Sequence, residues 1–396
     1  MTMDSEFDSD FYADPYPLYA RWREEGGVRK VPFPGGLDGW VVTGHADGKA
    51  ALNDPRLRKE TANEIFLTRM DGGDSGTGGA LTAHMLNSDP PAHTRLRRLV
   101  QKAFTARRVA GLRPRIEEIA DALLADMEGR DEVDLVRSFA LPLPLLVICE
   151  LLGVPDADRV PFRAHGERMN DGDKEALFSG FRPMAVYLAD LVRAKRKEPG
   201  DDLLSDLIRA QEDDDALSDQ EITSMAFLLL VAGHETTVGL IANGVRTLLA
   251  HPERLAEVRD DPSLLPAAIE EFLRHDGSVN VATLRYTAEP VTIGGTEIPA
   301  GEFVHVALIA ANRDPAAFPD PDRFDPGRDT GGHLAFGYGI HHCLGAPLAR
   351  LEAEIAFGRL LARFPAIAAS DAPEAWHHAL RFRALASLPV RLRARE

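Results

Sequence analysis

The chain has 396 residues, of which 44% are hydrophobic, and a formal net charge of −17. This length and composition suit one large core, so we expect a single domain over residues 1–396. The negative charge argues against nucleic acid as a partner.

The start of the chain, MTMDSEFDSDFYADPYPLYA, is acidic and lacks the apolar stretch of a signal peptide. The longest apolar run, MAFLLLVAG, is far shorter than the roughly 20 residues that span a bilayer. The only cysteines are Cys149 and Cys343. We therefore expect a cytoplasmic monomer without disulfides or membrane contact.

Hydrophobic periodicity predicts a mainly α fold with small β-sheets. GWVVTGHADGKAALNDP predicts a strand followed by a helix, and the glycine-rich 71–79 predicts a flexible loop that could act as a lid. From Arg95 to Ala250 the pattern is helical. Strand patterns return over 281–308, where IGG and PAG mark turns, and 379–392 is typical of a hairpin.

Cys343 lies in FGYGIHHCLG, directly after His341 and His342. A structural zinc site needs four ligands in tetrahedral array, and this contiguous spacing with a distant Cys149 argues against one. A catalytic Cys–His pair is an alternative, although such pairs need not adjoin in sequence.

The glycines around Cys343 favour a third interpretation, in which its thiolate is the axial ligand of haem iron. A flat macrocycle needs backbone without side chains at its closest approach, and Gly337, Gly339 and Gly345 provide that. The following APLARLEAEIAFGRLLARF has helical spacing. Cys343 would then precede a helix N-terminus, where amide dipoles favour a thiolate.

The pattern Phe336-Gly337-x-Gly339-x-His341-x-Cys343-x-Gly345 resembles the haem-binding loop of bacterial cytochromes P450. The resemblance covers essentially the whole chain and is closest in style to actinobacterial enzymes that tailor macrolides and other secondary metabolites. It implies the P450 fold, with haem b between a long oxygen-binding helix and the Cys343 loop. The cofactor-binding residues of this loop would be Phe336, Gly337, His341, Cys343 and Gly345.

FLLLVAGHETTVGLIANGV is an apolar helix with a polar cluster at its centre. An unpaired polar group in a core lowers the stability of the fold by roughly 1–3 kcal/mol, so we expect the cluster to have a function. Threonine can bond back to helix carbonyls, and Gly233 leaves room for a small ligand. The resemblance implies that Thr236 hydrogen-bonds the bound oxygen and Glu235 relays protons. The helical offset of His234 from Thr236 points His234 elsewhere.

EEFLR places Glu271 and Arg274 three residues apart on one helical face, where they can pair. They match the P450 Glu-x-x-Arg signature, and the resemblance implies that Arg323, in FPDPDRF, completes a buried triad. We assign this triad to folding and haem retention, since breaking a buried pair costs several kcal/mol.

The two haem propionates require cations. DPPAHTRLRRLV places His93 and Arg97 four residues apart on one helix face, and ATLRYTAEP contains Arg285. The resemblance places these three residues and His341 at the propionates. It assigns no role to His342, which we expect to fill space on the cysteine side of the haem.

From Arg95 to Arg108, RLRRLVQKAFTARR contains six basic residues and no acidic one. This stretch is either a solvated helix face or a docking patch. No G-x-G-x-x-G follows a strand, so no flavin or nicotinamide module is indicated and a separate electron donor is needed. The resemblance implies an acidic ferredoxin, with its reductase, that docks here near Cys343.

By family position, the substrate pocket lies above the haem, roofed by the region of Met85 and the loop at 168–181. Its predicted residues are small or apolar and suit a bulky hydrophobic molecule; they are Met85, Leu229, Ala232, Asn280, Val281 and Thr283.

The resemblance implies a haem-thiolate monooxygenase that uses O₂ to hydroxylate or epoxidise such a molecule in macrolide or polyketide antibiotic biosynthesis. Desaturation, ring coupling and peroxide-driven oxidation by the same fold are alternatives. A haem-based sensor or carrier is another, and it would not need Glu235 and Thr236.

Overall fold

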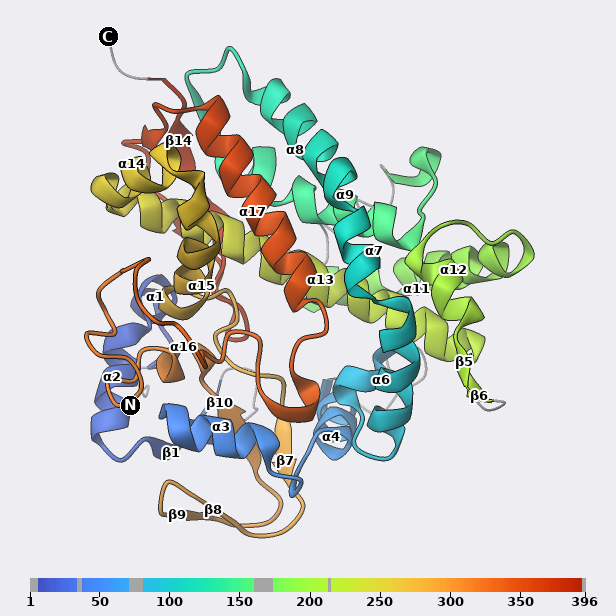
Figure 1. Cartoon of the computed structure of the whole chain (residues 1–396). Coiled ribbons are helices and arrows are strands. Elements are labelled where there is room, and N and C mark those ends of the chain that lie inside the picture. Colours follow the sequence, from blue (N-terminus) through green and yellow to red (C-terminus); the bar gives the residue numbers. More distant parts are fainter. Residues whose placement is uncertain (1–5, 34–37, 71–80, 160–173, 213–214, 394–396) are drawn as a thin grey trace.

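The computed structural model describes residues 6–33, 38–70, 81–159, 174–212 and 215–393. Helices dominate it, and small sheets lie at its edges (Figure 1). The predicted loop at 71–79 and the segment 168–173 of the predicted roof lie outside the described residues. The main helices are α1 (Ser9–Ala13), α2 (Tyr16–Glu24), α3 (His45–Asn53), α4 (Glu60–Met70), α6 (Ala92–Ala103), α7 (Ala106–Gly111), α8 (Arg113–Met127), α9 (Pro142–Leu152), α11 (Lys174–Lys197), α12 (Leu203–Arg209), α13 (Asp219–Ala250), α14 (Pro252–Asp260), α15 (Leu265–His275), α16 (Leu308–Ala311) and α17 (Ala346–Arg363).

Helix α13 is the central element, and α9, α11, α15 and α17 all pack against it. It begins at a capping box, in which the Ser218 hydroxyl accepts the Glu221 N–H and the Glu221 carboxylate accepts the Ser218 N–H. It ends at His251, just before Pro252. Within the described residues, α13 alone is long and apolar enough to cross a membrane, but 67% of its apolar window is buried inside the protein. Its apolar character therefore reflects its place in the core.

The largest sheet joins segments that are far apart in sequence. Its strand order is β1 (Val28–Val31), β2 (Gly39–Val42), β10 (Phe303–Val306), β7 (Arg285–Thr287) and β3 (Leu57–Arg58). Strands β2 and β10 are parallel, and the other neighbours are antiparallel. A Cβ at Gly39 would lie 2.6 Å from the Phe303 carbonyl oxygen, so the β2–β10 contact excludes a side chain at this position. This sheet carries Arg285 on β7.

The turn predicted at IGG is confirmed, because Gly294 and Gly295 have positive φ and join β8 (Val291–Ile293) to β9 (Thr296–Ile298). The hairpin predicted over 379–392 is wrong. Strand β13 (Leu385–Ser387) pairs with β12 (Ala375–Trp376), whereas β14 (Pro389–Arg391) pairs with β4 (Glu132–Asp134) and β11 (Ala368–Ala369). Only Leu388 separates β13 from β14, which is too short a connection for a hairpin, so the chain changes sheets there. The remaining described strands are β5 (Gln211–Glu212) and β6 (Asp215–Ala216).

The predicted pair of Glu271 and Arg274 is confirmed. Both side chains have 0% exposure, and the two groups form a bidentate ion pair with N–O distances of 2.6 and 2.8 Å. The guanidinium also donates to the carbonyls of Asn312 and Pro321. The pair thus ties α15 to the irregular segment that precedes the Cys343 loop.

The predicted third member of this triad, Arg323, is wrong. Its side chain is 65% exposed and pairs with Asp325, whereas its carbonyl faces Arg274 at 3.4 Å. The second guanidinium near Glu271 belongs to Arg328, whose Nε lies 3.5 Å from Glu271 Oε1 and whose side chain is 9% exposed. Because the backbone of Arg323 faces the pair, its side chain projects to solvent and leaves this place to Arg328.

We predict that Arg274→Met lowers the free energy of unfolding by about 3–5 kcal/mol, because it leaves the Glu271 carboxylate buried without its main partner. Arg323→Met should change it by less than about 0.5 kcal/mol, as is usual for an exposed position. Urea unfolding followed by circular dichroism measures both. In our assignment Arg274 and Arg328 belong to the buried cluster and Arg323 does not. An equal loss of unfolding free energy in the two variants would contradict it.

Candidate active site

The Cys343 loop is a closed turn stabilised by its own backbone. The Cys343 N–H donates to the Phe336 carbonyl at 2.9 Å, and Gly337 and Gly339 both have positive φ. A Cβ at Gly339 would lie 2.6 Å from the Asn53 side-chain oxygen, so α3 closes that side of the loop. Gly345 is the N-cap of α17, which confirms that Cys343 lies just before a helix N-terminus.

The thiol of Cys343 is accessible even though protein surrounds it, because it lines an internal cavity. Burial raises the pKa of this thiol, and the N–H groups of Gly345 and Ala346 and the charge of Arg97 only partly oppose that rise. The helix N-terminus therefore does not by itself maintain the thiolate. A thiolate here needs a cationic partner inside the cavity.

The cavity lies between α13 on one side and the Cys343 loop with α17 on the other. Leu229, Ala232, Gly233 and Thr236 line it from α13. From the opposite side it is lined by Phe336, Gly337, His341, Cys343, Gly345 and Leu348. Most of the lining is apolar, as suits a flat hydrophobic ligand with a few polar groups.

The polar cluster of α13 divides between the cavity and the core. The Thr236 hydroxyl donates to the Ala232 carbonyl at 2.6 Å, which is the predicted bond back to the helix. His234 is buried and its Nε2 lies 3.1 Å from the Leu141 carbonyl, away from the cavity as predicted. A Cβ at Gly233 would lie 3.3 Å from Ile148, so this position is also constrained by α9. Burial raises the pKa of Glu235 to about 7, with Arg381 opposing the rise.

Basic side chains gather at one end of the cavity. The rings of His93 and His341 lie 4.3 Å apart, and Arg97 donates to the His342 carbonyl at 2.8 Å. Arg285 is buried and donates to the Thr283 carbonyl. All four residues predicted at the propionates are therefore neighbours. His342, to which no role was assigned, is exposed, with its ring centroid 6.3 Å from that of Phe336.

Sequence reasoning missed a fifth member of this cluster, Lys59, which is buried and donates to the Thr283 hydroxyl. After burial, the charges of Lys59, His93, Arg285 and Arg97 lower the pKa of His341 to about 2. Both ring nitrogens of His93 are buried and have no partner within the described residues. The charges of Lys59, Arg97 and Arg285, which Asp89 compensates only in part, and the unpartnered ring nitrogens of His93 fit a ligand that brings two carboxylates. Nothing in RLRKE distinguishes Lys59 before the fold is known.

A sequence profile described as cytochrome P450 matches residues 188–375. Cytochrome P450 107B1 of Saccharopolyspora erythraea is 53% identical over 392 residues, which are 97% of this chain and 96% of that protein. This chain belongs to the cytochrome P450 family. The 6-deoxyerythronolide B hydroxylase of the same organism is 46% identical over 99% of this chain and 100% of its own length. The solved structure of P450 monooxygenase TamI bound to tirandamycin C is 46% identical, with a TM-score of 0.90 over 98% of this chain and 99% of that one.

The P450 fold predicted from the sequence is confirmed, as are its class as a monooxygenase and its cofactor, haem b. The site suits that cofactor on three counts that belong to this chain. The cavity is flanked by the Cys343 thiol, it lies against glycine backbone of the loop, and the five basic residues offer partners for two propionates.

The predicted substrate wall of this P450 is partly wrong. Met85, Leu229, Ala232 and Thr283 line the cavity, but Asn280 and Val281 do not. The Asn280 amide oxygen accepts the Tyr19 hydroxyl at 2.8 Å, and Val281 packs in the cluster around Tyr19. Their backbone N–H groups bond to the Arg381 carbonyl, which turns both side chains away. Ser278, Val279 and Ala282 line the cavity from this segment instead.

Glu352 of α17 was also missed. Its carboxyl group is buried, lines the cavity, and has one oxygen without a partner in the described part of the chain. Burial raises its pKa well above the usual value, which favours the protonated form of this carboxyl group. The signal was present in the sequence, since LARLEAEI places this glutamate on an apolar helix face.

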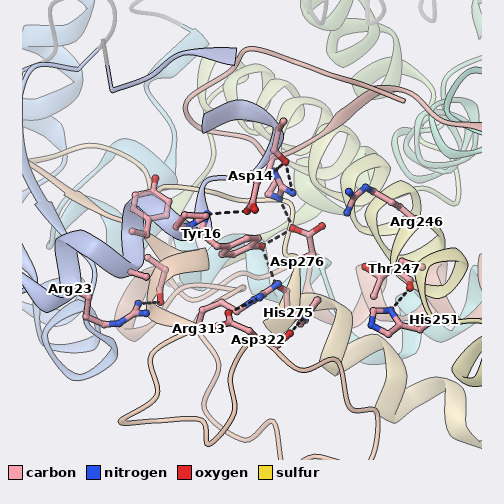
Figure 2. Close-up of a pocket in the computed structure, with 17 residues that line it drawn as sticks. Asp14, Tyr16, Arg23, Arg246, Thr247, His251, His275, Asp276, Arg313 and Asp322 are labelled. Atoms are coloured by element: carbon pink, nitrogen blue, oxygen red, sulfur yellow. Dashed lines mark hydrogen bonds and ion pairs between the residues drawn. The ribbon is translucent and has the colours of Figure 1, made fainter. Parts of the chain in front are cut away.

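A second cavity lies between α2 and the C-terminal ends of α13 and α15, and charged residues line it (Figure 2). The Tyr16 hydroxyl donates to Asp276 at 2.6 Å, and Arg383 pairs with the same carboxylate. Arg313 pairs with Asp322 at 2.8 Å and stacks over the Tyr16 ring. These charged groups are paired with one another. We therefore assign this cavity, the Tyr16 junction, to structure and not to ligand binding.

An ion-pair cluster supports the Cys343 loop from α15. Glu270 accepts Arg350 at 2.5 Å and His333 at 3.0 Å, and the Arg350 guanidinium lies 4.6 Å from the centre of the Phe336 ring. Burial tends to raise the pKa of Glu270, but these two partners outweigh it and hold the pKa at about 2, against a usual value of 4.5. The stability that this cluster contributes is therefore present above about pH 4.5 and is lost as the pH falls toward 2.

We predict that Glu270→Gln flattens the loss of stability between pH 4.5 and 2 and lowers the free energy of unfolding at pH 7 by about 1–2 kcal/mol. Urea unfolding at pH 7, 4.5 and 3 measures this difference. Glu354→Gln, which removes a 41% exposed carboxylate of α17, is the control and should follow the wild-type pH dependence. If the free energy of unfolding fell with pH by the same amount in Glu270→Gln and in the wild type, Glu270 would not be the source of this pH-dependent stability.

Proposed function

We propose that this P450 hydroxylates or epoxidises a bulky, largely hydrophobic molecule of the polyketide or macrolide type, within antibiotic or other secondary-metabolite biosynthesis. One observation carries the proposal: the Cys343 thiol and the Thr236 region of α13 line the same apolar cavity from opposite sides. The names of two relatives, 6-deoxyerythronolide B hydroxylase and a tirandamycin C-bound monooxygenase, support the substrate class.

Haem with an axial thiolate, when bound, activates O₂ and inserts one of its oxygen atoms into the substrate. In this proposal Cys343 ligates the iron, while His93, Arg97, Arg285 and His341 hold the propionates. Lys59 extends this cationic set.

Proton delivery is the task that we propose for Glu235 and Thr236. The Thr236 hydroxyl lines the cavity and can exchange its bond to Ala232 for one to a ligand. Glu235 is the next residue along the chain, and its pKa of about 7 suits a group that both takes up and releases protons near neutral pH. A sensor or carrier would have no use for this arrangement.

We further propose that residues 1–396 form one domain that acts as a cytoplasmic monomer. Relatives that align over 97–99% of the chain support the single domain. P450 enzymes of this family use a small-molecule substrate, O₂ and a redox partner, and we propose an acidic ferredoxin with its reductase as that partner.

The docking site for this ferredoxin is narrower than the predicted Arg95–Arg108 stretch. The side chains of Arg95 and Arg108 are only 35% and 21% exposed, so both are less accessible to a partner protein. Arg98, Lys102 and Arg107 are exposed on α6 and α7. On the Cys343 loop, Tyr338 and Ile340 are 38% and 47% exposed. We define these five residues as the proximal face.

We predict that Thr236→Ala lowers the fraction of consumed reducing equivalents that appears in product by about tenfold or more and releases hydrogen peroxide instead, because proton delivery contributes 10²–10⁴-fold to such steps. Thr237→Ala is the neighbouring control. The ratio of peroxide to NADPH consumed, with a macrolactone as probe, measures this coupling. Unchanged coupling in Thr236→Ala would overturn the proposed proton path.

We predict that the double variant Arg98→Glu/Lys102→Glu slows reduction by an acidic ferredoxin by about tenfold at low salt, with a smaller effect at high salt, because exposed charges are screened. Stopped-flow reduction under carbon monoxide measures the rate. Arg137→Glu, at an 83% exposed position outside the proximal face, should leave it unchanged. Equal rates for the double variant and wild type would exclude docking on the proximal face.

A further inference from the structure

Lys59 follows strand β3 directly, and the register of the largest sheet brings it close to Arg285. Strands β3 and β7 are antiparallel, with Arg58 opposite Tyr286. Lys59 is the next residue on one strand and Arg285 the next on the other, so their backbones approach each other. Lys59 is only 3% exposed. The sheet thus brings a buried ammonium group to the end of the haem cavity at which basic side chains gather, here called the basic end.

Asp89 compensates the charge of Lys59 only in part, because its carboxylate is bonded to other groups. It accepts the backbone N–H groups of Lys59 and Glu60, both at 3.1 Å, and pairs with Arg58 at 3.2 Å. Within the described residues, no ion pair reaches the ammonium group of Lys59. Burial lowers the pKa of Lys59, so its charged form is favoured only if a further anionic group lies nearby.

The ammonium group of Lys59 donates a hydrogen bond to the hydroxyl of Thr283. An ammonium group has donors only, so the hydroxyl uses a lone pair for this bond and keeps its own proton for another acceptor. No acceptor for that proton lies in the part of the chain that the structure describes. Thr283 lines the haem cavity. Its proton is therefore available to a ligand in the cavity.

The surroundings of Thr283 indicate which ligand atom takes this proton. The Arg285 guanidinium donates to the Thr283 carbonyl at 2.9 Å, and Arg285, His93 and His341 line the same cavity. Thr283 therefore belongs to the basic end, where we placed the carboxylates of the haem. A carboxylate oxygen accepts a hydroxyl proton more strongly than a neutral oxygen does. The bond from the ammonium group polarises the hydroxyl and strengthens this preference.

We infer that Thr283 is a cofactor-binding residue whose hydroxyl donates a hydrogen bond to a haem propionate, and that Lys59 acts through Thr283 as a positioning residue. Lys59 is not among the described residues that line the cavity, and its bond to Thr283 orients the hydroxyl proton toward the ligand. Thr283 thereby moves from the predicted substrate wall to the cofactor site. This inference rests on the proposed function, which places the propionates at the basic end.

The test measures how fast the substrate-free holoenzyme loses haem to an excess of apomyoglobin, a rate that reports on cofactor contacts and not on turnover. Thr283→Val removes the hydroxyl at nearly constant shape and should speed haem loss about tenfold or more, as expected for a hydrogen bond to a charged group. Thr283→Ser restores the hydroxyl and should stay close to the wild-type rate. Thr237→Val is the matched control, since Thr237 is 2% exposed and lines the same cavity from α13, and it should not change the rate.

Lys59→Met tests the route through Thr283. It should speed haem loss in the otherwise unchanged protein and add little in the Thr283→Val background, because two residues that act through one contact are not additive. Fully additive effects of the two substitutions would overturn the positioning role of Lys59.

Haem loss from Thr283→Val at the wild-type rate would overturn the inference. Equal rates for Thr283→Val and Thr283→Ser would do the same, because the hydroxyl would then have no part in the effect. If the proton serves a substrate oxygen instead, Thr283→Val will retain haem but weaken the binding of a macrolactone, measured by the spin-state shift, and this result also counts against the inference. The reduced carbon monoxide spectrum reports separately on the thiolate ligand. A thiolate spectrum with unchanged haem loss therefore contradicts only this inference, whereas a spectrum without thiolate ligation contradicts the proposed function.

Discussion

The ion pair of Glu271 and Arg274 is the contact on which the geometry of the haem site depends. From Arg274 a chain of hydrogen bonds runs to the Asn312 carbonyl, from the Asn312 side chain to the Leu334 N–H, and from the Leu334 carbonyl to the Gly337 N–H. Gly337 begins the turn that presents Cys343. A fully buried ion pair on α15 therefore positions the cysteine loop through a chain of hydrogen bonds that includes the Asn312 side chain.

The distribution of buried charge separates structure from function in this protein. At the Tyr16 junction and at Glu271 the buried charges neutralise one another. Along the haem cavity the balance differs, since His93, Arg97, Arg285 and His341 line one end of it and the buried Lys59 lies beside them, with Asp89 as a partly compensating acid. An uncompensated charge in a low-dielectric interior is costly. The basic end of the haem cavity is therefore where we expect a negatively charged group of a ligand to bind.

Two errors of prediction show where pattern reasoning failed. The pocket positions Asn280 and Val281 came from family position, but the segment is irregular and its N–H groups are fixed to Arg381, so Val279 and Ala282 face the cavity. Arg323 matched a motif in sequence, but only the course of the backbone decides whether its carbonyl or its side chain meets Glu271. In both cases the residue was near the right place and its orientation was wrong.

Local spacing was sufficient for features that depend on one element. The glycine–cysteine turn before α17, the paired Glu271 and Arg274 on one helical face, and the polar cluster within α13 all follow from chain neighbours, and all appear as predicted. Lys59 became visible as part of the site only with the tertiary structure. Its role follows from burial next to Thr283 and the other basic residues at a cavity that no single segment builds, because desolvation is a property of the packed whole.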